Sequence, residues 1–187
     1  MSLFRVLLLT IFVYSLSMAI PPPDNSSPDK VNIKDNIKVS MYGIDDLGFV
    51  VIWNGDGVQT VATAEWSGGR NGSESEYITK YLTKGTNYIM FILYNKVYQG
   101  GIFFSGGKWS YQFQLSKNGT PFWSSSNSKR NNTSGIKYWK VIQAKVASDG
   151  SVSLNDNIPS AALRELRKGL GQMESRIDAN AGIARPF

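Results

Sequence analysis

Apolar and polar residues alternate through much of the chain between residues 36 and 154. The clearest case is WSYQFQL (109–115), in which every second residue is aromatic or aliphatic and Ser110, Gln112 and Gln114 lie between them. A segment with this period buries one face and leaves the other in water. IKVSMYGI (37–44) has the same pattern, and KYWKVIQAKV (137–146) and SVSL (151–154) are also strand-like. These segments predict half-buried β-strands.

Two other segments, FVVIW (49–53) and YIMFILY (88–94), are continuously apolar. Such runs are expected for strands that are covered on both faces. Trp53 and Trp109 lie inside strands and are expected in the core. Asn54-Gly55, Asn118-Gly119 and Asp149-Gly150 predict type I′ hairpin turns, because their residues accept positive φ. The pattern over 36–155 therefore predicts an all-β fold, an antiparallel β-sandwich or jelly roll.

The last part of the chain, 156–187, has a different period. Its apolar residues are spaced by three and four positions, at Leu163, Leu166, Leu170, Met173 and Ile177. This spacing predicts a short C-terminal amphipathic helix, with Ser160 as a plausible N-cap. We call this apolar row of the helix its seam, and the sequence leaves two alternatives open for what the seam contacts. The helix packs on the sandwich, or it joins copies of the chain in a homo-oligomer through residues 160–178.

The first residues have the order of a secretory signal peptide. Arg5 precedes a short apolar stretch, and Ser17-Met18-Ala19 supplies small residues at the expected cleavage point after residue 19. The apolar stretch is shorter than the roughly 20 residues needed to span a bilayer. We therefore expect residues 1–19 to be removed, residues 20–35 to form a proline-rich leader, and the product to be secreted without a membrane span.

Composition excludes several classes of site. The formal net charge is +6, but the basic residues are scattered, so no nucleic-acid partner is expected. The chain has no cysteine and no histidine, which excludes disulfides, a Ser-His-Asp triad and the commonest zinc ligand. No spacing singles out a catalytic pair of carboxylates, and an enzyme is not expected. A metal would have to be a hard cation held by oxygen, with Ca²⁺ at Asp45, Asp46 and Asp56 as the candidate.

Five asparagines satisfy the Asn-x-Ser/Thr rule for N-glycosylation: Asn25, Asn71, Asn118, Asn131 and Asn132. All five lie in polar, loop-like stretches, so behind a signal peptide they are candidate glycosylation sites.

Several short motifs resemble the galactose-binding-like β-sandwich, a jelly roll found as a carbohydrate-binding module. They are DDLGFVVIWNGDGV, EYITKYLTKGTNYIMFILYN and WSYQFQLSKNGTPFW, over about residues 36 to 122. The positions that carry the resemblance are Asp46, Asn54, Gly55, Ile78, Thr79, Leu82, Gly85, Asn87, Ile89 and Asn95. The resemblance implies a non-catalytic, lectin-like protein that binds a carbohydrate or glycoconjugate.

Sugar recognition needs flat apolar faces together with fixed polar groups. We expect these in loops: Trp66 and Arg70 in a glycine-rich loop (64–76), Tyr98 in a second (95–108), and Trp123 in PFWSSS (121–126), which leads into a low-complexity loop. Asp46 is the carboxylate expected beside them, although Asp45 and Asp46 also suit a local role in capping a loop. The alternative function is a structural extracellular matrix, coat or assembly subunit that uses the sandwich for protein contacts.

Overall fold

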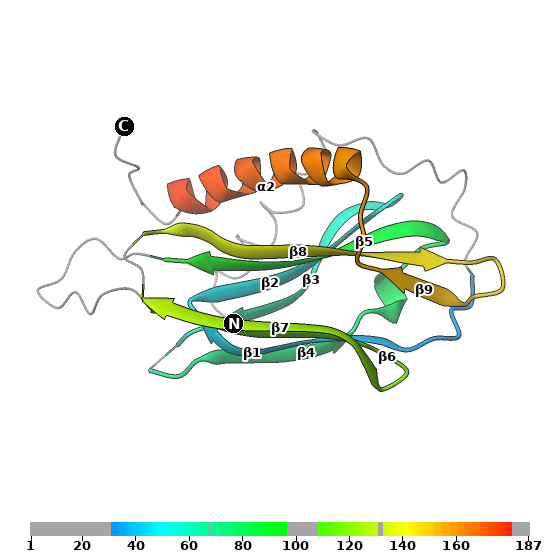
Figure 1. The fold of residues 1–187 in the computed structure, drawn as a ribbon, viewed down its shortest axis with the longest axis horizontal. Coiled ribbons are helices and arrows are strands. Elements are labelled where there is room, and N and C mark those ends of the chain that lie inside the picture. Colours follow the sequence, from blue (N-terminus) through cyan, green and yellow to red (C-terminus); the bar gives the residue numbers. More distant parts are fainter. Residues whose placement is uncertain (1–30, 68, 97–107, 131–132, 181–187) are drawn as a thin grey trace, which may run out of the picture.

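The computed structural model describes residues 31–67, 69–96, 108–130 and 133–180. Nine strands form two antiparallel sheets that face each other, and one long helix follows them in the sequence (Figure 1). The all-β sandwich with a C-terminal helix is therefore confirmed. In the described ranges, no helix is both long and apolar enough to cross a membrane.

The first sheet, called sheet A, has four strands in the order β4-β1-β6-β7. They are β1 (Ile37–Asp45), β4 (Gly72–Tyr77), β6 (Lys108–Lys117) and β7 (Thr120–Arg130). The second sheet, sheet B, has five strands in the order β3-β2-β5-β8-β9. They are β2 (Leu47–Asn54), β3 (Gly57–Glu65), β5 (Gly85–Asn95), β8 (Gly135–Val146) and β9 (Val152–Asn155). A single 3₁₀ turn, η1 (Thr79–Tyr81), follows β4.

The core between the sheets follows the predicted alternation. In β6 the buried residues are Trp109, Tyr111, Phe113 and Leu115, and in β1 they include Ile37, Val39 and Met41. Phe113 and Phe91 meet across the sandwich with ring centroids 5.5 Å apart. The half-buried character read from the sequence is thus confirmed for both strands.

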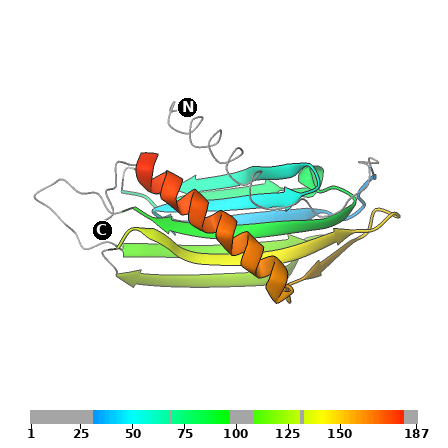
Figure 2. The same cartoon turned by 90° about the horizontal axis from the view of Figure 1, so that it is seen from above.

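Sheet B is covered on both faces. Its outer face carries a second apolar cluster that includes Phe49, Tyr88 and Met90. Helix α2 (Ser160–Asn180) crosses this face diagonally (Figure 2) and contributes Leu166 and Leu170, which are 0% and 3% exposed. This explains the continuous apolar runs of β2 and β5, because both of their faces are buried.

The packing of α2 bears on the two alternatives for its seam. Leu166 and Leu170 are buried on sheet B, and Leu163 packs against the same cluster. The side chains of Met173 and Ile177 lie outside the described residues. Glu174 fixes the far end of the helix, since its Oε1 accepts the backbone N–H of Ile136 at 2.8 Å. The first half of the seam is therefore occupied within the monomer, while self-association through 160–178 stays a prediction.

Only one of the three predicted type I′ turns has that geometry. Asn118 and Gly119 both have positive φ, 52° and 80°, between β6 and β7. In the β2–β3 hairpin the positive φ falls on Gly57 instead of Asn54 and Gly55. The side chain of Asn54 explains the difference: its Oδ1 accepts the backbone N–H of Asp56 at 3.0 Å and shapes a local turn. At the third turn only Gly150 takes positive φ, 84°.

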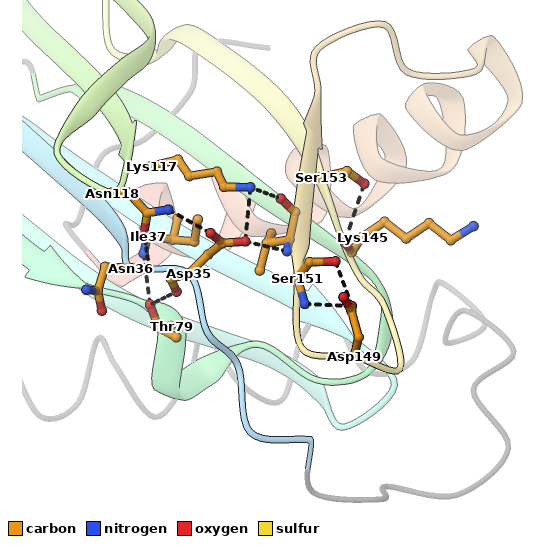
Figure 3. A network of polar contacts seen from close by, with 11 residues as sticks. Asp35, Asn36, Ile37, Thr79, Lys117, Asn118, Lys145, Asp149, Ser151 and Ser153 are labelled. Atoms are coloured by element: carbon orange, nitrogen blue, oxygen red, sulfur yellow. Dashed lines mark hydrogen bonds and ion pairs between the residues drawn. The ribbon is translucent and has the colours of Figure 1, made fainter.

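The described part of the leader, residues 31–35, is hydrogen-bonded into the sandwich. Asp35 accepts hydrogen bonds from the backbone N–H of Val152 at 2.7 Å and from Asn118 Nδ2 at 2.7 Å, and it pairs with Lys117 Nζ at 3.0 Å (Figure 3). These contacts lower the pKa of Asp35 to about 2. We call this group of four residues the Asp35 clasp. It joins the N-terminal segment to both sheets, so residues 31–35 are not a free linker.

Candidate functional site

The first candidate site is the acidic connection between β1 and β2. The backbone oxygen of Asp46 accepts the N–H of Trp66 at 2.7 Å, and its Oδ2 accepts the N–H of Lys96 at 2.6 Å. Lys96 Nζ in turn lies 2.6 Å from Glu65 Oε1. Burial, opposed by the Lys96 hydrogen bond and reinforced by the nearby Asp45, raises the pKa of Asp46 to about 6. The carboxylate holds neighbouring backbone, as the capping alternative requires.

Two of the predicted ligand-binding residues lie beside this connection. Trp66 is 41% exposed, and the backbones of Ser67 and Arg70 exchange hydrogen bonds of 3.0 and 3.1 Å in the turn that follows it. Asp46, Trp66 and Arg70 thus lie at the same end of the sandwich. Tyr98 lies outside the described residues. Asp46, Trp66 and Arg70 do not line either of the two described pockets, which lie beside Asn54 and Asp56 and beside Lys38 and Tyr77.

The predicted calcium site is not assembled. Asp45 and Asp46 precede β2, whereas Asp56 follows it in the turn to β3. The eight residues of β2 place the two ends roughly 26 Å apart. Across the described ranges, no group of three or more Asp, Glu, His or Cys side chains is placed to hold a metal ion. The expectation of a joint Asp45, Asp46 and Asp56 site was wrong because the intervening strand is extended.

Trp123 does not lie in a loop. PFWSSS and the serine-rich stretch after it form β7, and Trp123 pairs with the buried Leu115 of β6. Its ring packs on Phe91, with centroids 4.9 Å apart. Trp123 is therefore directed toward the core and is not available as an exposed loop platform. Similarly, the second half of the expected loop at 64–76 is strand β4.

Two of the five candidate glycosylation sites are described. Asn71 is exposed, and its Nδ2 lies 3.5 Å from Gly43 O and from Ser110 Oγ. Asn118 is exposed too, but its amide belongs to the Asp35 clasp and also accepts the N–H of Asn36 at 2.8 Å. Asn25, Asn131 and Asn132 lie outside the described residues. Use of these sites stays a prediction.

The second candidate site is the outer face of sheet A, where no described element packs (Figure 1). The strand registers assign its residues: Lys38, Ser40, Tyr42 and Asp45 from β1; Ser73, Ser75 and Tyr77 from β4; Lys108, Ser110, Gln112, Gln114 and Ser116 from β6; Ser124, Ser126, Ser128 and Arg130 from β7. This face is mainly hydroxyl and amide groups, with two exposed tyrosines. It contrasts with the apolar outer face of sheet B, which α2 covers.

The tyrosines belong to a continuous strip on β1 and β4. Tyr42 is 41% exposed and its hydroxyl lies 3.5 Å from Ser75 Oγ, which donates to Ser40 Oγ at 2.9 Å. Tyr77 is 59% exposed, and Lys38 Nζ lies 5.5 Å from its ring centroid. The strand register places the two tyrosines roughly 14 Å apart at Cα. We call Tyr42, Ser40, Ser75, Lys38 and Tyr77 the tyrosine strip.

A groove of about 920 Å³ continues from one end of the strip. Lys38, Ser75 and Tyr77 line it together with Val31 and Ile33 from the N-terminal segment. Its volume is within the range of sites for small ligands. Glu76 and Asp56 line the groove too, together with Lys80 and Lys84. The groove and the strip therefore form one continuous surface with aromatic, hydroxyl and charged groups.

The sequence patterns predicted no site on this surface, although part of the signal was present. The alternation of 109–115 already placed Ser110, Gln112 and Gln114 on the wet face. The segment GSESEY (72–77), however, has no apolar alternation, and Tyr77 was assigned to no site. Pairing with β1 makes this segment a strand and places Tyr77 opposite Lys38.

Comparison with known proteins identifies no relative of this chain. No protein-family model, no curated protein and no solved structure matches this chain.

Proposed function

We propose that this chain is a secreted, non-catalytic carbohydrate-binding protein, and that the outer face of sheet A holds its ligand. The observation that carries the proposal is the tyrosine strip: two exposed aromatic rings beside serine and glutamine side chains on a sheet face that no described element covers. Tyr42 and Tyr77 supply flat apolar surface for the C–H faces of sugar rings. Gln112 and Gln114 supply donors and acceptors for hydroxyl groups.

The layout of the face also favours an extended ligand. Tyr42 lies directly opposite Gln112 in the β1–β6 register, and Ser40 lies opposite Gln114. Polar groups therefore repeat beside the aromatic strip along the strand direction. The spacing between the two tyrosines exceeds the width of one sugar ring, so an oligosaccharide is needed to contact both.

This proposal keeps the lectin-like function that the galactose-binding-like resemblance implies, but places the ligand differently. That resemblance puts the site in loops, with Trp66, Arg70 and Asp46 as contacts. In the structure, Asp46 is already occupied by the Lys96 backbone, whereas Tyr42 and Tyr77 have exposed faces. The sheet face is the better-supported site for this chain.

The test is a glycan-array screen of residues 20–187, with and without Ca²⁺, followed by affinity measurements on any glycan that binds. Tyr42→Ala and Tyr77→Ala are compared with Trp66→Ala, which removes an exposed aromatic residue at the other candidate site. We expect each tyrosine variant to bind about tenfold more weakly, as expected for a lost contact of about 1.4 kcal/mol. All three variants should unfold at the wild-type urea concentration, because these side chains are exposed.

The outcomes separate the sites. Binding that is lost in the tyrosine variants and retained in Trp66→Ala supports the sheet face. The reverse result would return the site to the loop after β3. An array without any bound glycan would reject the carbohydrate-binding function.

A second candidate function, an extracellular assembly subunit, is favoured by the edge of sheet A. Strand β7 has 11 residues, and among the described strands it pairs only with β6. An edge strand of this length presents backbone N–H and C=O groups to which another chain can pair. Light scattering over a concentration series tests this function. Oligomers that Ser125→Pro disrupts would support it, and a monomer at every concentration would count against it.

A further inference from the structure

We infer that the carbohydrate bound by sheet A is acidic: a uronic-acid polysaccharide whose carboxylates are held by cations at the two ends of the outer face. This inference rests on the proposed function. It adds the charge of the ligand and the residues that select it, beginning with Lys38.

The strand registers sort the charged residues of sheet A. In β4, the residues Ser73, Ser75 and Tyr77 lie on the outer face, while the two glutamates between them are directed to the other side. Of those glutamates, Glu76 pairs with Lys80 at 2.8 Å. Among the described residues of the outer face, Asp45, opposite Ser110, is the only carboxylate. Apart from Asp45, and from Glu76 and Asp56 in the adjoining groove, the described residues of this surface include no carboxylate that would repel an anion.

The cations on the same face lie at its two ends. Lys38 is at the end that borders the groove, and it forms no ion pair with a described carboxylate; its Nζ lies over Tyr77 instead. Lys108 and Arg130 are at the opposite end, directly across from each other in the β6–β7 register. Like charges in directly opposed positions destabilise a sheet. An anion held between Lys108 and Arg130 would relieve that repulsion.

The distance between these cations defines the length of the ligand. Lys38 lies opposite Ser116, and Ser116 and Lys108 are eight positions apart in β6, or roughly 26 Å along the strand. The tyrosine strip and the Gln112 and Gln114 row fill the interval. Only a polymer of several sugar units with repeated carboxylates reaches both ends. A ring stacked on Tyr77 would place its carboxylate beside Lys38, where an ammonium already lies against the aromatic face.

The experiment compares uronic-acid polysaccharides with their carboxyl-reduced forms, which keep the backbone and remove the charge. Wild-type protein, Lys38→Met and Lys145→Met are tested against each pair. Lys145 is an exposed lysine on β8 of the other sheet, so it matches the charge change away from the face. We expect reduction of the polysaccharide to weaken binding, and Lys38→Met to weaken binding of the acidic form by about two- to fivefold. Lys145→Met should bind like the wild type.

Ionic strength and chain length provide further readouts. Affinity for the acidic form should fall as salt is raised past about 0.1 M, where the screening length is about 10 Å, and affinity for the neutral form should not. A further variant, Lys108→Met, should weaken binding of long acidic chains but not of oligomers too short to reach both Lys38 and Lys108.

Equal binding of acidic and reduced polysaccharides would overturn the acidic ligand and leave carbohydrate binding intact. Absence of binding to every glycan, charged or neutral, would reject the proposed function and this inference together. Loss of binding in Lys145→Met as large as in Lys38→Met would show that net charge alone is responsible and would overturn the assignment to this face.

Discussion

Replacing Asn87 by alanine should destabilise the protein more than any other single change to a polar side chain described above. Asn87 is fully buried in β5. Its Oδ1 accepts the N–H of Thr83 at 2.9 Å and Asn54 Nδ2 at 3.0 Å. Its Nδ2 donates to Thr83 O at 2.8 Å and to Ala144 O at 3.3 Å. One side chain thus joins the segment after η1, the end of β2 and strand β8.

The magnitude follows from the groups left without a partner. The Asn54 amide keeps its bond to Tyr81 O at 3.0 Å, but the N–H and C=O of Thr83 lose their partner. Each buried polar group left unsatisfied costs about 1–3 kcal/mol. We therefore expect a loss of about 3–5 kcal/mol, a large part of the 5–15 kcal/mol typical of a whole domain.

Urea unfolding measures this loss from the shift of the midpoint at constant slope. The matched control is Asn155→Ala, on β9 of the same sheet. Asn155 is exposed, and its bonds are local contacts with Asn157 at 2.9 and 3.3 Å. The control should lose less than about 1 kcal/mol. A loss of that small size for Asn87→Ala would refute the assigned role of the network.

Three further changes test other parts of the structure. Leu166→Ala removes a fully buried side chain between α2 and sheet B and should cost about 2–5 kcal/mol in urea unfolding, whereas Arg167→Ala on the exposed side of the same helix should be near neutral. The raised pKa of Asp46, about 6, means that the folded state holds its proton more tightly than the unfolded state does, so stability should fall as pH rises from about 4 to 6 and then level off. Asp46→Asn should lack that part of the pH profile, and identical profiles would contradict the assignment. Gly150→Ala and Gly119→Ala both place alanine at positive φ, but only at Gly150 does the new Cβ meet a carbonyl of the N-terminal segment, so the first variant should lose more stability.

The sequence predicted the strands whose residues have strong periods. Alternation placed Trp109 and Phe113 in the core, and the continuous apolar runs predicted that β2 and β5 are covered on both faces. Edge strands were missed because they bury little: β4 and β7 are mostly exposed serine, asparagine and charged residues. β4 and β7 form strands because they pair with β1 and β6, and their own sequences have no apolar alternation that would predict this.

The candidate site was harder to predict than the fold. Exposure of Tyr42 and Tyr77 depends on which sheet the helix covers, and the seam of Leu166 and Leu170 suits a helix partner as well as a sheet. The glycine-rich stretches instead predict loops, and they made Trp66 the expected exposed aromatic contact. In the resemblance motifs, Asn54 and Asn87 belong to a buried hydrogen-bond network that positions strands. In this chain the two side chains therefore serve the sandwich itself and carry no information on a ligand.

The position of α2 has a consequence for how the protein is made. The helix is the last described element to leave the ribosome, yet it covers the outer face of sheet B, whose strands β2 and β5 are synthesised long before it. Until α2 has been synthesised, Phe49, Tyr88 and Met90 lack the cover that the helix gives them. An apolar face that stays open during synthesis favours aggregation and chaperone binding. The yield of folded protein should therefore depend on how quickly the helix docks, and substitutions in α2 should lower yield even where every strand is intact.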